Sequence, residues 1–361
     1  MKYILSILSL LILLAVLNCG SDSGYHTEVT KIGRCFSDYN ALVSDSLADY
    51  LVVTQGDITN HRSYQGMIYK RDFNRPEFSW RQLKDRYDGE TYGVFNSDNY
   101  IFIFCYEYTT KEYKPSQAGK YLHMFCKAEQ KIIKSFDVDS LYIKDLYMIN
   151  DSSWYMLGNY TNYAYQTCVV STFDMGKTFD TAYIDRVIDQ SKFDDRILYF
   201  INSKINGDTG YFYQYYLSNN SLDSTIFDFT PYDFAFDNNR LLWVLGTKGD
   251  SVLLKKQGGD MFNTVYTFCV DTVSLPKNLY FSDDLIIAYV SQIDYGAMFG
   301  LGGTRNLFYY SDDVGENWRM IDEFENALYL KALSVYQNKR ISACVGSDRI
   351  LTVYLDNRDL K

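Results

Sequence analysis

Short runs of alternating or wholly apolar residues follow one another along the chain, separated by turns rich in Gly, Asn, Asp and Ser. These runs have the length of strands, and no convincing long amphipathic helix interrupts them after residue 26. The composition agrees: 35 Tyr and 23 Phe stand against only 4 Pro, and aromatic rings suit a pleated, half-buried surface. The pattern therefore predicts an all-β protein.

The runs group into sets of four, with two exceptions. We predict strands at 41–45, 50–55, 66–71 and 77–82; at 92–95, 99–108, 120–128 and 131–136; at 141–149, 153–157, 165–171 and 177–183; at 197–202, 210–217 and 225–229; at 232–236, 240–246, 251–256 and 262–268; at 278–281, 285–291, 305–310 and 317–321; and at 328–336, 340–345 and 350–355. The fourth set is poorly marked, and the seventh ends after three strands.

A motif of the form S/T-x-D-x-G-x-x-aromatic occurs twice, 139 residues apart, which is three periods of about 46. Such a spacing is typical of repeat proteins with four strands per unit. The glycine supplies the positive φ of a tight turn, and the short carboxylate can accept hydrogen bonds from backbone N–H groups within it. The two copies match at Thr172, Asp174, Gly176 and Phe179, and at Ser311, Asp313, Gly315 and Trp318. A weaker third copy at 255–262 keeps only Gly259 and Phe262.

This motif resembles the Asp-box, or BNR repeat, of the β-propellers found in sialidases and sortilin-type receptors. The resemblance implies that each box lies in the turn between the third and fourth strands of a blade, away from the active site, and has a structural role. Together with the strand sets it predicts a seven-bladed β-propeller, with six or eight blades as alternatives. The segment 28–36 would then complete the seventh blade and close the ring, because an unpaired sheet edge is prone to aggregate.

The first 18 residues have the features of a signal peptide: one basic residue, Lys2, and an apolar run over 4–17 that is too short for a membrane span. The run ends at Cys19, as in bacterial lipoproteins, although Asn18 departs from the small residue usual before the cysteine. An ordinary secretory signal is the alternative. We expect a signal peptide at 1–18, lipidated Cys19 and a flexible tether at 19–25, and a single propeller domain at 26–361.

The charge of the chain limits the kinds of partner that it is expected to bind, and the positions of its cysteines indicate their redox state. The chain has 35 basic and 45 acidic residues, a net charge of −10 without a basic cluster, so nucleic acid is not an expected partner. Six further cysteines, Cys35, Cys105, Cys126, Cys168, Cys269 and Cys344, lie in apolar, strand-like runs rather than in loops. We therefore expect buried free thiols, with one disulfide as the alternative.

Catalytic and metal-binding patterns are missing from the sequence. The three histidines are scattered, and no C-x-x-C or H-x-x-x-H spacing occurs, so no metal and no cofactor are predicted. Sialidases with Asp-boxes carry an F/Y-R-I-P motif and three arginines that grip the substrate carboxylate. The nearest string here, Phe73-Asn-Arg-Pro76, has an insertion and falls between a third and a fourth strand. No catalytic residue is assigned, and an Asp/Glu pair assembled in space is left open.

The face opposite the Asp-boxes should carry the ligand, on the loops that join second to third strands and one blade to the next. Aromatic and polar residues of these loops would suit sugar stacking or protein recognition. The predicted ligand-binding rim consists of His61, Arg62, Tyr64, Tyr113, Tyr160, Tyr163 and Tyr295. These tyrosines could equally cover loop ends in a Tyr-rich protein.

The sequence thus favours a monomeric, lipid-anchored, non-catalytic propeller of the bacterial cell envelope, attached to the outer membrane only by its lipid, that binds a protein or glycan ligand. The alternative is an exported glycoside hydrolase of sialidase-like fold. A third option, an assembly factor or inhibitor of a neighbouring envelope protein, differs from the first only in its partner.

If Cys19 carries the lipid, the substitution Cys19→Ala should release a soluble or uncleaved product. Each buried CH₂ of an acyl chain contributes about 0.8 kcal/mol, and two or more chains hold a protein firmly on the membrane. Fractionation of cells into membrane and soluble pools measures this directly. Unchanged membrane retention of the variant would rule out the anchor.

Overall fold

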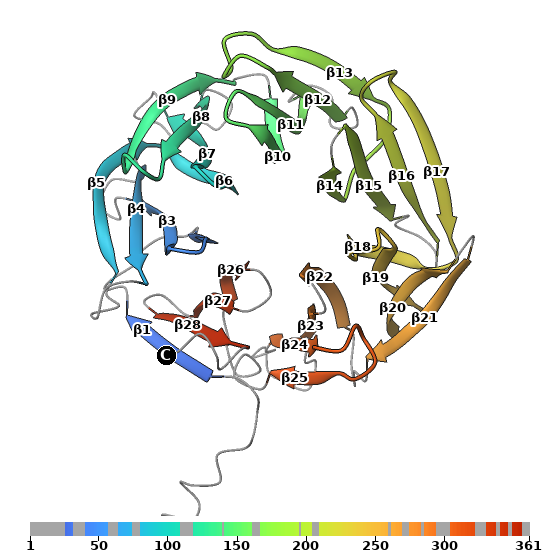
Figure 1. Ribbon diagram of the computed structural model, residues 1–361. Helices are drawn as coiled ribbons and strands as arrows, with labels where there is room; N and C mark the ends of the chain where they lie inside the picture. The colour runs from blue at the N-terminus through green and yellow to red at the C-terminus, as the bar shows by residue number, and fades with distance from the viewer. Residues whose placement is uncertain are drawn as a thin grey trace, which may run out of the picture.

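The computed structural model describes residues 26–31, 40–56, 64–73, 80–108, 118–138, 141–160, 167–194, 196–203, 209–258, 261–268, 274–282, 285–293, 304–321, 330–336, 340–345 and 349–355. These residues form seven four-stranded antiparallel sheets arranged as blades around a central axis (Figure 1). The predicted seven-bladed propeller is therefore confirmed. Within the described ranges no helix could span a membrane.

Blades 1 to 6 each use four consecutive strands. Blade 1 comprises β2 (Asn40–Ser44), β3 (Ala48–Gly56), β4 (Tyr64–Asp72) and β5 (Arg81–Asp88). Blade 2 comprises β6 (Glu90–Asn96), β7 (Tyr100–Tyr108), β8 (Ala118–Cys126) and β9 (Lys131–Asp137). Blade 3 comprises β10 (Leu141–Asn150), β11 (Ser153–Tyr160), β12 (Thr167–Thr172) and β13 (Asp180–Ile184).

Blade 4 comprises β14 (Gln190–Asp194), β15 (Ile197–Ser203), β16 (Gly210–Tyr216) and β17 (Ser221–Phe227). Blade 5 comprises β18 (Thr230–Phe236), β19 (Leu242–Lys248), β20 (Ser251–Gly258) and β21 (Met261–Phe268). Blade 6 comprises β22 (Ser274–Ser282), β23 (Leu285–Ile293), β24 (Thr304–Ser311) and β25 (Arg319–Ile321). In Figure 1 the first strand of each of blades 2 to 6 lies nearest the axis and the fourth lies on the outside.

Blade 7 joins the two ends of the chain. Its strands are β26 (Leu330–Tyr336), β27 (Arg340–Val345), β28 (Arg349–Tyr354) and, on the outer edge, β1 (His26–Lys31). β1 pairs with β28 from His26↔Tyr354 to Lys31↔Arg349. The predicted closure is confirmed: 28–36 was predicted, and the described part of the closing strand covers 26–31, while residues 32–39 lie outside the described part of the chain.

Most strands differ from the predicted ranges by a few residues, and two depart further from the predictions. β14 was not predicted, because Gln190–Asp194 is a polar segment without alternation and none of its side chains is fully buried. The last strand of blade 1 runs over Arg81–Asp88, whereas 77–82 was predicted. Its side chains alternate between buried or half-buried and exposed, but only two of the four inward positions, Leu83 and Tyr87, are apolar, so the sequence signal is weak. The pairing of β4 with β5 shifts register between Met67 and Tyr69.

The core lies between blades rather than within any one of them. The sequence of β7 is apolar without interruption because residues 101–105 are all fully buried. Phe102 and Phe104 pack toward blade 3 in one cluster, whereas Ile101, Ile103 and Cys105 pack toward blade 1 in another. Successive side chains of a strand point to opposite faces, so both faces of this sheet are covered.

Buried charged residues reinforce the closure between blades 7 and 1. Arg71 of β4, which is fully buried, forms a 2.5 Å ion pair with Glu28 of β1, and the Tyr354 hydroxyl donates to the same carboxylate at 3.1 Å. Arg340 of β27 contacts the fully buried Asp49 of β3 at 2.9 Å. Burial raises the pKa of Asp49, although the Arg340 guanidinium lowers it. These pairs link strands that are far apart in sequence.

The Asp49–Arg340 pair gives a stability prediction. In the Asp49→Asn variant the buried Arg340 guanidinium loses its counter-charge, so the free energy of unfolding should fall by about 3 kcal/mol or more. A matched control is Glu129→Gln, which removes the acid of the half-exposed Glu129–Lys131 pair and should cost less than about 1 kcal/mol. Urea denaturation followed by tryptophan fluorescence measures both. Equal effects of the two substitutions would contradict a structural role for the buried pair.

Candidate ligand-binding pocket

A cavity of about 720 Å³ opens at one face of the ring, where blades 2, 3 and 4 meet. Its wall comes from the β6–β7 turn, the end of β10 with the β10–β11 turn, and single residues of blades 3 and 4. The residues that line it are Asn96, Ser97, Asp98, Asn99, Leu146, Tyr147, Met148, Ile149, Asn150, Asp151, Ser152, Met175 and Phe193. Its size is within the range of small-molecule sites, about 300–1,000 Å³.

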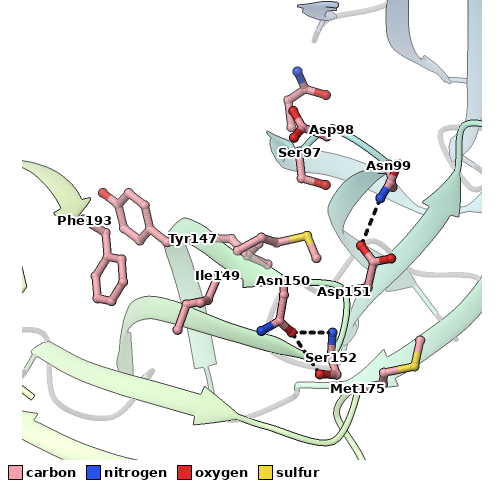
Figure 2. Close-up of a pocket in the computed structure, with 13 residues that line it drawn as sticks. Ser97, Asp98, Asn99, Tyr147, Ile149, Asn150, Asp151, Ser152, Met175 and Phe193 are labelled. Carbon is pink, nitrogen blue, oxygen red and sulfur yellow. Dashed lines mark hydrogen bonds between the residues drawn. The ribbon is translucent and has the colours of Figure 1, made fainter. Parts of the chain in front are cut away.

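Two aromatic rings form one end of the pocket (Figure 2). Tyr147 of β10 and Phe193 of β14 stack with their centroids 5.7 Å apart and an interplanar angle of 29°. The buried Tyr155 of β11 supports Phe193 at 4.7 Å. This contact fixes the ring of Phe193 while leaving it on the pocket wall. The pair offers a flat apolar surface of the kind on which sugar rings and bases stack.

Hydrogen bonds hold Tyr147 in place. Its hydroxyl donates to Asp145 Oδ2 at 2.5 Å and lies 2.7 Å from Ser191 Oγ, which also donates to Asp145 at 3.2 Å. Burial raises the pKa of Tyr147 well above its ordinary value, and the Asp145 carboxylate raises it further. The pKa of Asp145 is raised by burial, against the lowering effect of its hydrogen bonds. Tyr147 therefore stays protonated and acts as a fixed donor.

Polar side chains form the other end of the pocket, as Figure 2 shows. Asn99 Nδ2 of blade 2 donates to Asp151 Oδ1 of blade 3 at 3.1 Å, which ties the two turns together. Ser152 donates from its backbone N–H and its hydroxyl to Asn150 Oδ1, at 3.0 and 2.9 Å. Of the described residues lining the pocket, two are aspartates and none is lysine or arginine. The site is thus a weakly acidic one.

The turn of blade 3 whose motif resembles an Asp-box, and which is called by that name from here on, supplies part of the wall. Met175, which has a positive φ of 59°, lines the pocket and donates its N–H to Ser152 O at 2.9 Å. Asp174 Oδ1 accepts from the N–H groups of Lys177 and Thr178, both at 2.9 Å. Gly176 has a φ of 69° and donates to Thr172 Oγ1 at 2.9 Å. The box therefore shapes the backbone that carries Met175.

The turn of blade 6 has the same construction. Asp313 Oδ1 accepts from the Asn317 N–H and the Ser311 hydroxyl at 2.8 and 2.7 Å, and Gly315 has a φ of 87°. The aromatic residue of each box contacts the preceding blade. Trp318 stacks on Tyr266 of β21 at 5.3 Å, and Phe179 meets Phe136 of β9 edge-on at 6.2 Å. In the degraded third copy, Phe262 likewise meets Phe227 of β17 at 5.0 Å.

The pocket lies on the same face as the Asp-boxes, because its turns join first to second and third to fourth strands. The ligand-binding rim was predicted on the opposite face. His61, Arg62, Tyr113, Tyr163 and Tyr295 lie outside the described residues, as does Cys19. Tyr160 ends β11 and half-buried Tyr64 begins β4. The rim remains a prediction.

Other parts of the site were not evident from the sequence. The pocket uses consecutive polar residues of two turns, 96–99 and 149–152, together with Phe193 on the unpredicted strand β14. Turn residues of this kind are ordinary in any strand-rich sequence. Only the repeat spacing, which places equivalent turns of neighbouring blades on one face, could have suggested that they meet.

Comparisons with solved structures agree with the fold at very low sequence identity. A polysaccharide lyase, the PL25 ulvan lyase, matches with a TM-score of 0.53 and 10% identity over 91% of this chain and 96% of that chain. The propeller domain of the Trilobed protease from Pyrococcus furiosus gives 0.54 and 10%, over 88% and 95%. The WD40 propeller domain of Doa1 gives 0.55 and 8%, over 92% and 98%.

No protein-family model matches this chain, and a search of curated proteins found no match either. At such low identities the structural likenesses show the propeller fold alone, because propellers serve many unrelated functions.

The Asp-boxes give a prediction for acid stability. Hydrogen bonds from Asn317 hold the pKa of Asp313 at about 2, and those from Thr178 do the same for Asp174, against an ordinary value of 3.8. A lowered folded-state pKa stabilises the fold above the ordinary value, and this contribution disappears as the pH falls toward 2. The urea midpoint of Asp313→Asn should therefore lie below that of wild type at pH 7, and the difference should shrink between pH 4 and pH 2.

The matched control is Asp312→Asn, which removes the same charge one residue away, where the exposed carboxylate makes only a 3.7 Å ion pair with Arg319. Its midpoint should stay close to that of wild type at neutral pH. A pH-independent difference for Asp313→Asn, or one matched by Asp312→Asn, would contradict the assignment.

Proposed function

We propose that this protein is a lipid-anchored, non-catalytic propeller of the bacterial envelope, and that its pocket binds a neutral or amine-bearing glycan. The observation that carries the proposal is the combination of a stacked aromatic pair with amide, hydroxyl and carboxylate groups in one cavity. A sugar ring presents apolar C–H faces to aromatic rings and hydroxyl groups to planar polar side chains. The pocket provides partners for both.

The charge of the pocket indicates which class of glycan it would bind. Recognition of a sugar carboxylate or sulfate favours arginine, which binds such groups in a bidentate manner. The described lining carries Asp98 and Asp151 and no basic residue. Their negative charge would repel an anionic sugar and favour a neutral or cationic one.

The alternative, a sialidase-like glycoside hydrolase, is less well supported. That activity needs a cluster of arginines at the centre of the ring. In the described residues, the first strands of the seven blades carry no arginine. The acidic pocket would also disfavour a sialic acid. A neutral-glycan hydrolase that uses two carboxylates is distinguished from a binding protein by turnover.

A glycan array probed with the full-length protein in detergent tests the proposal. We expect binding to neutral or amine-bearing oligosaccharides, and Phe193→Ala should weaken it about fivefold, since a lost aromatic contact contributes on the order of 1 kcal/mol. The control is Phe173→Ala, which truncates a 57% exposed ring on the neighbouring Asp-box turn that does not line the pocket. Binding restricted to sialylated or sulfated glycans, or to proteins, would contradict the proposal, and cleavage of a bound glycan would show a hydrolase.

A further inference from the structure

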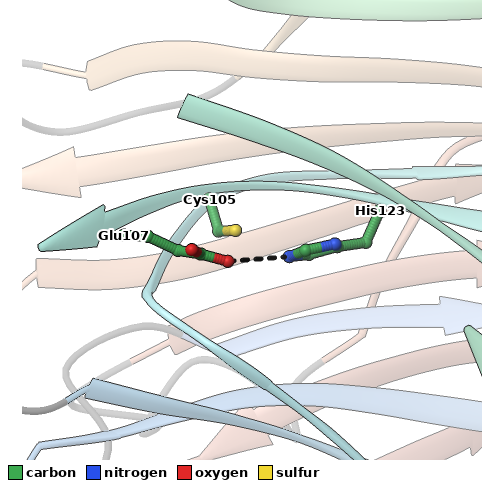
Figure 3. Close-up of side chains that lie close together, drawn as sticks. All are labelled: Cys105, Glu107 and His123. Atoms are coloured by element: carbon green, nitrogen blue, oxygen red, sulfur yellow. Dashed lines mark ion pairs between the residues drawn. The ribbon is translucent and has the colours of Figure 1, made fainter. Parts of the chain in front are cut away.

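Three potential metal ligands meet on one face of blade 2, away from the pocket. Cys105 and Glu107 lie two residues apart on β7, so their side chains point to the same side of the sheet. On the neighbouring strand β8, His123 pairs with Ile103, and Tyr121 pairs with Cys105. Strand pairing therefore brings His123 onto the same face. Figure 3 shows the three side chains converging.

The separations suit a metal ion with little rearrangement. One donor atom from each of the three residues lies within 4.8 Å of the other two, and His123 Nε2 is 3.9 Å from Glu107 Oε1. In a tetrahedral zinc site, ligand bonds of about 2.0–2.3 Å place neighbouring donor atoms about 3.3–3.8 Å apart. The Glu107 side chain is 30% exposed and can move inward by that difference.

His123 is already oriented as a ligand. Its ring is buried, stacks on Tyr121 with an interplanar angle of 6°, and contacts Tyr87 at 5.3 Å. Its Nδ1 lies 2.7 Å from Ser135 Oγ on β9, while its buried Nε2 has no hydrogen-bond partner among the described atoms. Metal-binding histidines commonly use one nitrogen for such an outer partner and the other for the ion. A buried nitrogen without a partner is otherwise unfavourable.

The protonation states are compatible with this role. Burial lowers the pKa of His123 to about 4, so the ring is neutral at pH 7 and its contact with Glu107 in Figure 3 is not an ion pair under those conditions. Burial raises the pKa of Glu107, and the charge of Asp88 adds to that increase. Burial raises the pKa of the Cys105 thiol, and the negative charges of Glu107 and Asp88 raise it further. A bound divalent cation would instead lower the pKa values of Glu107 and Cys105.

The blade 1–blade 2 connection runs beside the cluster. Gly89 has a φ of +121°, and a Cβ there would lie 2.7 Å from Tyr106 O and 3.3 Å from Glu107 Cγ. The Cys105 thiol donates to the backbone carbonyl of Asp88 at 3.9 Å, so the exposed Asp88, at the end of β5, lies beside the cluster. A cation could enter from the partly exposed Glu107 side. The carboxylate of Asp88 is outside the 4.8 Å cluster and would have to turn toward the ion to serve as a fourth ligand, which would connect the two blades.

We propose that Cys105, Glu107 and His123 form a binding site for a divalent transition-metal ion of the zinc class, with Asp88 or water in the fourth position. A mixed set of sulfur, nitrogen and oxygen donors favours such an ion over Ca²⁺ or Mg²⁺, which prefer oxygen ligands. Three ligands on adjacent strands of one blade make the site independent of the glycan pocket. Its expected effect is to stabilise the packing of blades 1 and 2.

Cobalt titration of the full-length protein tests this proposal, because Co²⁺ replaces Zn²⁺ and its bond to a thiolate gives a charge-transfer absorption band. The protein is reduced, stripped with a chelator, kept in detergent and titrated with CoCl₂. We expect one equivalent to bind with a thiolate band, and the melting temperature to rise. The band should disappear in Cys105→Ser and persist in Cys168→Ser, which changes another buried free cysteine, on β12.

His123→Ala should lower the Co²⁺ affinity at least 100-fold. Because substitution of a buried residue can prevent folding, Glu107→Gln serves as the second variant. Its partly exposed side chain can be changed without a cavity, and circular dichroism verifies the fold. We expect at least a tenfold loss of Co²⁺ affinity in folded Glu107→Gln. Absence of binding in wild type, a band that survives in Cys105→Ser, or unchanged affinity in folded Glu107→Gln would each overturn the proposal.

Discussion

Ring closure is the constraint on which the other features of this protein depend. Each blade is a thin sheet with apolar side chains on both faces, so it is stable only between two neighbours. A linear row of blades would leave two such faces in water. Pairing of β1 with β28 completes the last blade, and the packing of Leu42, Leu51 and Val53 with Ile350 covers the face of blade 1 that turns toward it.

The buried ion pairs at the closure specify the register of the closing strands, in addition to that apolar contact. Replacing a buried charge pair by apolar residues is often neutral or favourable for stability, so such pairs are better regarded as determinants of register. A one-residue slip of β1 along β28 would turn Glu28 to the opposite face and away from Arg71. The pairs thus favour one alignment between two strands that the apolar pattern alone would align less strictly.

Much of the fold was predictable because the repeat fixes the phase of the strands. The two Asp-boxes fall in equivalent turns of blades 3 and 6, and the middle strands of the blades, such as β7 and β11, are apolar enough to be found directly. The first and fourth strands of the blades were less predictable. β14 is a short polar strand next to the axis (Figure 1), and β5 has apolar residues at only two of its inward positions, Leu83 and Tyr87.

The candidate sites were less predictable for a different reason. Cys105, Glu107 and His123 are ordinary strand residues until pairing of β7 with β8 places them together, and neither histidine spacing nor cysteine spacing indicates such a cluster. The pocket likewise combines turns of two blades with Phe193 of a third. In a propeller, neighbours across blades are about one repeat apart in sequence. Local motifs therefore report on turns, and sites must be read from the assembled ring.

The pairing of β1 with β28 also has a consequence for the order in which the protein can be completed. A ribosome makes residue 28 early and residue 354 much later, after a separation of 326 positions. During synthesis blades 1 to 6 can acquire all their strands in turn, but the apolar face of blade 1 that blade 7 covers remains exposed until blade 7 has formed. A chain that stops before β28 keeps that face open however well its other blades have formed. Closure thus makes full-length synthesis a condition of the folded state, and prematurely terminated chains would be exposed to proteases.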